Sequence, residues 1–120
     1  MALQKISANR PELLQRHKTE LLGLLAETTQ IELRWHLAQM TPRLQLTSPE
    51  RHHAVVALER YLRDRSSIVR TFALQALFDL SQNDAALRGD VKQLLEAALR
   101  SGTPAMKTRA RNLLKNFPSP

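Results

Sequence analysis

The fold is decided by residues 67–77, which read Ser67-Ile68-Val69-Arg70-Thr71-Phe72-Ala73-Leu74-Gln75-Ala76-Leu77. Val69, Ala73 and Ala76 recur at the three- and four-residue spacing that puts side chains on one face of a helix. Ser66 or Ser67 supplies the side-chain oxygen that a helix start favours. This pattern predicts a helix that begins here and continues through residue 80.

The same pattern recurs in both directions along the chain. Five positions of this helix match positions 37 residues later, namely Val69 with Met106, Ala73 with Ala110, Ala76 with Leu113, Leu77 with Leu114 and Leu80 with Phe117. Four match positions 36 residues earlier, where Leu33, Arg34, Leu37 and Met40 precede Val69, Arg70, Ala73 and Ala76. Each copy is preceded by another apolar periodic run. A fixed period of this kind indicates stacked repeats. The sequence therefore predicts three helix pairs at about 9–46, 47–83 and 84–120.

Cap residues place the ends of the predicted helices. Thr29 and Glu32 have capping-box spacing, which predicts the start of the helix over residues 31–41. Ser48-Pro49 and Thr103-Pro104 each join a cap residue to a proline at the first helical position. Asn83 or Asp84 opens a further helix that reaches residue 99 or 100, and Gly102 suits the position after its end. The first helix is expected to run unbroken from residue 11 to residue 27.

Residues 67–77 and 104–110 resemble the second helix of a HEAT repeat, in which Val-Arg is followed by Ala and then by Ala-Leu at helical spacing. Lys107 stands in the place of the arginine, and Leu33-Arg34 is a third, less similar copy. The resemblance implies an all-α domain over residues 1–120, with three antiparallel helix pairs stacked as a short right-handed α-solenoid. It also implies that Arg34 and Arg70 are structural positions, which bond to acids such as Glu27 and Asp64. The function implied is partner binding without catalysis.

Composition limits the function classes further. The chain has no cysteine, which excludes thiolate metal sites and cysteine nucleophiles. No histidine spacing predicts a metal site, no glycine-rich phosphate loop occurs, and no cofactor is expected. The N-terminal residues lack the apolar core of a signal peptide, and no run is long and apolar enough to span a membrane. We therefore expect a cytoplasmic protein that is not an enzyme.

Two surfaces are candidates for partner binding. The first is the exposed face of the second helices, where Trp35, Thr71, Arg111 and Lys115 are expected to form one concave surface that runs from aromatic to basic and suits a protein partner with an apolar and an acidic end. The second is a basic stripe of Lys107, Arg111 and Lys115, which follow one another at four-residue intervals in a segment with no acidic residue from 97 to 120. This stripe predicts either contacts to nucleic acid or another polyanion, or a solvated cap on the last helix. The net charge of +7 is compatible with both interpretations.

Leu74 and Phe78 lie on the side of their helix away from Val69 and Ala73. They are therefore either part of an apolar partner surface or buried against a neighbouring helix. Burial is the expected outcome for Phe78, because large aromatic side chains are seldom left exposed.

Overall fold

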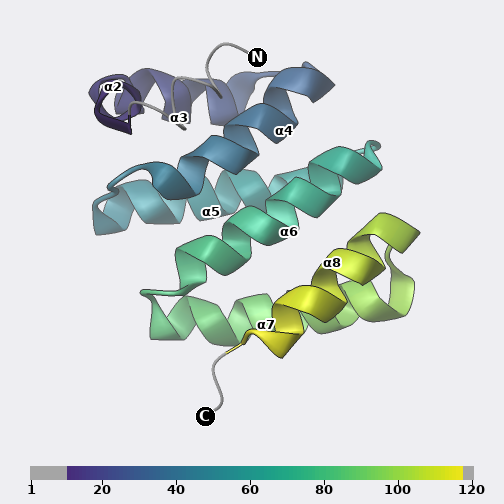
Figure 1. Ribbon diagram of the computed structural model, residues 1–120. Coiled ribbons are helices and arrows are strands. Elements are labelled where there is room, and N and C mark those ends of the chain that lie inside the picture. Colours follow the sequence, from purple (N-terminus) through teal and green to yellow (C-terminus); the bar gives the residue numbers. More distant parts are fainter. Residues whose placement is uncertain (1–10, 118–120) are drawn as a thin grey trace.

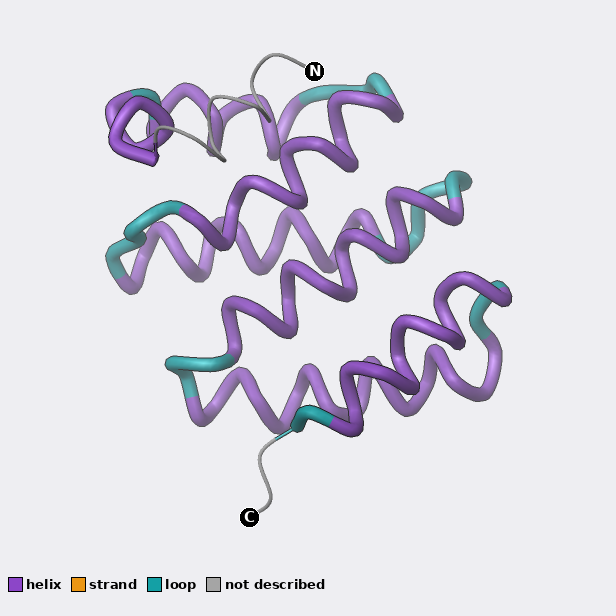
Figure 2. The backbone as a smooth tube through the Cα atoms, viewed as in Figure 1, coloured by secondary structure: helices purple, strands orange, loops and turns teal. Residues whose placement is uncertain are grey.

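The computed structural model of the chain describes residues 11–117, and every regular element in that range is a helix. Figures 1 and 2 show the course of the chain. In order, the elements are α2 (Pro11–Arg16), α3 (Lys18–Glu27), α4 (Ile31–Met40), the short 3-10 helix η1 (Thr41–Arg43), α5 (Ser48–Tyr61), α6 (Ser67–Ser81), α7 (Ala85–Ser101) and α8 (Pro104–Lys115).

Side-chain caps set the starts of the last four helices. The Ser66, Asp84 and Thr103 side chains each accept a hydrogen bond from a backbone N–H in the first turn of α6, α7 and α8, as predicted for these three helices. The cap of α5 is Thr47 rather than the expected Ser48, and Glu50 completes a capping box with it. This one-residue shift still leaves Pro49 in the first turn, where it sacrifices no helical hydrogen bond.

The end of α7 requires its glycine. Gly102 donates its backbone N–H to the Ala98 carbonyl at 2.8 Å. A Cβ atom at this position would lie 2.6 Å from that carbonyl oxygen and 2.9 Å from the Cβ of Met106. The turn from α7 into α8 is therefore too tight for any other residue without movement of the chain.

Two expectations for the first pair were wrong. The capping box at Thr29 is not formed, because Gln30 is the N-cap of α4 and makes no side-chain cap bond. The first helix is also broken at His17 into α2 and α3. The Gln15 side chain connects α2 to the segment after η1, because it donates to the carbonyl of Gln45 at 3.2 Å and accepts from the N–H of Gln45 at 2.8 Å.

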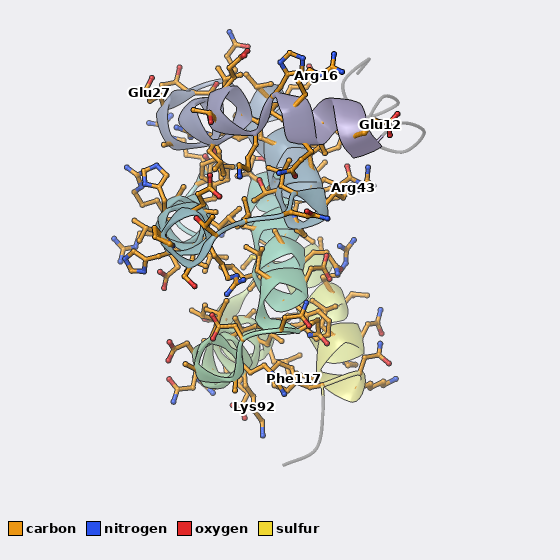
Figure 3. All side chains as sticks on the ribbon, turned by 90° about the vertical axis from the view of Figure 1, so that its left-hand side faces the viewer. Glu12, Arg16, Glu27, Arg43, Lys92 and Phe117 are labelled. Carbon is orange, nitrogen blue, oxygen red and sulfur yellow. The ribbon has the colours of Figure 1, made fainter. Side chains whose placement is uncertain are left out.

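The helices lie in two layers. Figure 1 shows α4, α6 and α8 side by side at the front, running in the same direction, with α3, α5 and α7 behind them. Figure 3 shows the two layers edge-on. α6 is central, because it packs against α4, α5, α7 and α8. It contacts its neighbours in sequence, α5 and α7, and also the two other helices of the front layer, α4 and α8.

Some core positions that match at the 37-residue period are buried to the same degree. Leu58 and Leu95 are both 0 % exposed, as are Ala73 and Ala110. The small alanine side chains let the helices approach closely, and one cluster of buried side chains extends from Leu14 in α2 to Leu113 in α8. The core is therefore continuous through the described part of the chain.

Candidate partner-binding groove

A groove of about 600 Å³ crosses the front layer. α4, η1, α6 and α8 all contribute to it. The residues that line it are Ala38, Gln39, Pro42, Arg43, Phe72, Gln75, Ala76, Asp79 and Arg109. Figure 3 shows Arg43 on the same side of the molecule as this layer. The groove combines apolar walls with two guanidinium groups and one carboxylate, which is the kind of mixed surface that ligand and partner sites present.

A row of flat side chains reaches the groove at Phe72 and Arg109. Trp35 stacks on His36 with 3.7 Å between ring centroids, and it stacks on Phe72 at 5.1 Å. The Arg109 guanidinium lies over the Phe72 ring, 5.6 Å from its centroid. Since α6 packs between α4 and α8, Trp35 and Arg109 reach Phe72 from opposite sides. The row therefore joins all three helices of the front layer, and its members use their ring faces on one another.

Polar side chains continue from this row along α6. Arg109 donates to the Gln75 side chain at 3.1 Å, and Gln75 donates to the Asp79 carboxylate at 3.0 Å. The pKa of Asp79 is raised, because partial burial of its carboxyl group outweighs the hydrogen bond from Gln75 and the charge of Arg109. This chain of bonds holds the Arg109 side chain in place at the groove.

The structure separates the residues that were expected to share one surface. Trp35 is half-buried in the aromatic row. Thr71 is 6 % exposed, so its expected position on the exposed face was wrong. Its hydroxyl donates to the Ser67 carbonyl at 2.7 Å, and this bond lets the side chain lie between helices without an unsatisfied polar group. Phe72, the next residue, lines the groove instead.

Arg111 and Lys115 are exposed but do not line the groove. The reason is their register. Arg70, Leu74 and Phe78 are the residues at positions four, eight and twelve after the N-cap of α6, and this side of α6 faces the third pair. Leu74 meets Leu94 and Met106 at a shared hollow, and Phe78 packs edge-on against Phe117 at 5.8 Å. The expected burial of Phe78 is confirmed, and Leu74 is buried with it.

The same three positions of α8 are Lys107, Arg111 and Lys115. Because α8 is the last helix of the layer, this side of α8 has no described helix beyond it. Lys107 is partly buried, and the other two side chains are exposed. The basic stripe therefore lies at the end of the stack and not on the groove.

Arg34 and Arg70, the arginines expected to have a structural role, have different bonding partners. Arg34 forms an ion pair with Asp64 and donates from Nε to the Thr28 carbonyl at 2.9 Å. Glu27, the other expected acid, does not take this role. Arg70 donates to the Arg65 carbonyl at 3.4 Å and has no acidic partner among the described residues. Arg34 thus bonds to an acid, as was expected of both arginines. Arg70 bonds to a backbone carbonyl instead.

Sequence reasoning missed most of the groove. Phe72, Gln75, Asp79, Arg109 and Arg43 were not among the expected site residues. One signal pointed to two of them: Phe72 and Arg109 are 37 positions apart and each is the sixth residue after its N-cap. The groove is therefore built on repeat-related positions, one register beyond Thr71.

His36 makes the aromatic row sensitive to pH. The side chain is 4 % exposed and its Nδ1 atom has no hydrogen-bond partner. Burial lowers the pKa of His36 below its ordinary value of 6.5, and the nearby charge of Glu32 offsets this only in part. The unfolded chain therefore binds a proton at this residue at a higher pH than the folded chain does.

We predict that the free energy of unfolding decreases as the pH falls below about 6.5, because protonation then favours the unfolded state. Thermal midpoints measured between pH 7.5 and pH 5 should show this decrease in the wild type, and a His36→Gln variant should show less of it. His17, His52 and His53 are exposed and remain in both proteins as internal controls. Equal pH profiles for the two proteins would contradict the assignment.

No family model, curated protein or solved structure matches the chain. Within residues 11–117, no group of three or more potential ligand side chains is arranged to hold a metal ion. No helix in the same range is long and apolar enough to cross a membrane.

Proposed function

We propose that the chain is a HEAT-like stack of three antiparallel helix pairs, a short right-handed α-solenoid, and that it is a non-catalytic protein-interaction module of the cytoplasm. The partner binds along the front layer, over the groove between α4, α6 and α8. One observation carries this proposal: side chains from three successive second helices converge on one groove of about 600 Å³. In stacked-repeat proteins, such a layer is the surface on which partners bind.

The side chains of the groove favour a peptide segment over a nucleic-acid strand. Bases stack on free aromatic faces, but the faces of Phe72 are taken by Trp35 and Arg109. The Phe72 ring, Pro42 and two alanines form the apolar part of the surface, and Arg43 and Arg109 bring positive charge to it. A partner segment with an apolar side chain next to an acidic one suits this combination, because an arginine pairs well with a carboxylate.

The test compares two arginines on the same helix. Arg109 lines the groove, whereas Arg111 lies two residues further on and outside it. We expect Arg109→Gln to weaken binding of a partner captured from the source cell by about tenfold or more, which corresponds to roughly 1.4 kcal/mol. Arg111→Gln should bind like the wild type. Calorimetric titration of the purified partner with the three proteins provides the comparison, and equal affinity for all three would exclude the groove.

A second candidate function rests on the basic stripe. The described part of the segment from residue 97 onward contains no acid, and Arg111 and Lys115 are exposed on the last helix. These charges suit phosphate groups of nucleic acid or another polyanion. The alternative is a polar end that keeps the last pair soluble.

We expect the triple variant Lys107→Ser, Arg111→Ser and Lys115→Ser to keep its fold, with a change in stability of about 0.5 kcal/mol or less per exposed position. If the stripe binds phosphates, the triple variant should bind random duplex DNA more weakly than the wild type does, and its affinity should depend less on salt. A fluorescence-anisotropy titration at several salt concentrations measures both quantities. Identical binding curves for the two proteins would leave the stripe with a solubilising role only.

A further inference from the structure

Two arginines occupy equivalent positions in successive pairs but have different surroundings. Arg34 and Arg70 are each the fourth residue after the N-cap, which is Gln30 in α4 and Ser66 in α6. Arg34 reaches forward to the second pair, where Asp64 lies two residues before Ser66. The Asp64 side chain is 4 % exposed, and its two oxygens accept from Arg34 and from the backbone N–H of Ser66. The carboxylate therefore fills the space between the pairs and neutralises the arginine.

The next interface lacks this carboxylate. The position two residues before the N-cap Thr103 is Ser101, whose hydroxyl donates to the Ala97 carbonyl at 3.2 Å. Arg70 keeps a bond to a backbone carbonyl, that of Arg65. Its Nε atom is buried and has no hydrogen-bond partner. A buried donor of a charged group without an acceptor is costly. The interface around Arg70 therefore lacks an acceptor of the kind that Asp64 supplies to Arg34.

A hollow of about 240 Å³ lies at this place. Arg70, Ser101 and Gly102 line it together with Leu62 and apolar side chains of α6, α7 and α8, and no acidic residue contributes to its wall. The position of Ser101, at the end of α7, is exposed. The hollow thus joins an arginine that lacks an acid to an accessible hydroxyl, within an apolar surround that strengthens electrostatic attraction.

We propose that Arg70 and Ser101 form an oxyanion site, in which a phosphate group takes the place that the Asp64 carboxylate has in the preceding interface. The phosphate is either a free ion or a phosphoester on Ser101. In the second case the Ser101 Oγ bonds to the γ-phosphorus of a nucleoside triphosphate, the bond from that phosphorus to the bridging oxygen breaks, and the nucleoside diphosphate and the hydroxyl proton leave. A separate protein kinase would catalyse this transfer. The bound group accepts from Arg70 and ties α6 to the third pair, independently of what the groove binds.

The test uses thermal midpoints of the full chain. One arm titrates the unmodified protein with inorganic phosphate, against chloride at equal ionic strength. The other arm uses protein that carries phosphoserine at position 101. Ser101→Asp serves as a permanent carboxylate, and we expect it to raise the midpoint by about 2–5 °C. Phosphoserine should raise it at least as much, and inorganic phosphate should raise it in a saturable way if the free ion binds.

Arg70→Gln is the matched variant, and each of these increases should vanish in it. If Arg70→Gln does not fold, Arg70→Met replaces it, because methionine keeps an unbranched side chain but carries no charge to bind the anion. A rise with inorganic phosphate in the wild type alone identifies the free ion as the ligand, and a rise with phosphoserine alone identifies the phosphoester. No rise in any arm, or equal rises with and without the site, would overturn the proposal.

Discussion

Leu77→Asp should unfold the protein. Leu77 is 1 % exposed and lies on α6, the helix that packs against α4, α5, α7 and α8. An aspartate at this place puts a charge into the cluster of buried apolar side chains, and an isolated buried charge costs several kcal/mol after the protein relaxes. The loss of the buried leucine adds about 2–5 kcal/mol. Together these costs reach the whole stability of a domain of this size, which is roughly 5–15 kcal/mol.

Ile68→Asp is the control for this variant, because Ile68 lies on the same helix and is 42 % exposed. It should melt within a few degrees of the wild type. Far-UV circular dichroism during heating distinguishes the two results, with no cooperative transition expected for Leu77→Asp. A melting curve like that of the wild type would mean that α6 has a different rotation from the one described.

Asp64→Ala should cause the second largest loss, about 2–3 kcal/mol. The Asp64 carboxylate is almost fully buried and pairs with Arg34, whose side chain is 28 % exposed. Removing one partner of a buried pair leaves an uncompensated charge, which costs about 3–5 kcal/mol when the remaining group is fully buried. The partial exposure of Arg34 reduces this cost. The backbone N–H of Ser66 also loses its acceptor.

The comparison variant is Glu20→Ala, which removes an acid whose side chain is 78 % exposed and which pairs with the exposed His17. Urea denaturation should show little change for it. The double variant Asp64→Ala with Arg34→Met should recover part of the loss, because the unpaired guanidinium is then absent. If Asp64→Ala lowered the free energy of unfolding no more than Glu20→Ala does, the ion pair between Arg34 and Asp64 would not stabilise the fold.

The sequence was sufficient for the features that depend on local physics. A cap oxygen at Ser66, Asp84 or Thr103 satisfies a backbone N–H group in the first turn of its own helix. These helix starts can therefore be predicted without knowledge of any tertiary contact. The apolar periodicity of residues 67–77 similarly marks the face of α6 that must be buried. The break at His17 was not predictable in this way, because no proline or glycine marks it in the sequence.

The candidate site was predicted only as a layer of helices, and its residues were decided by packing. Successive residues of a helix differ by about 100° in direction, so an error of one register exchanges Thr71, which is buried, for Phe72, which lines the groove. Periodicity shows that α6 has neighbours but not the rotation at which α4 and α8 meet it. Two positions that are apolar and buried in α6, Leu74 and Phe78, correspond to the exposed Arg111 and Lys115 of α8. Sequence alone was sufficient for the all-helical class and for the caps of α6, α7 and α8, since these depend on neighbouring residues. The groove, the aromatic row and the unmatched Arg70 were decided by tertiary structure, since each depends on side chains about 30 or more positions apart that meet only when the pairs stack.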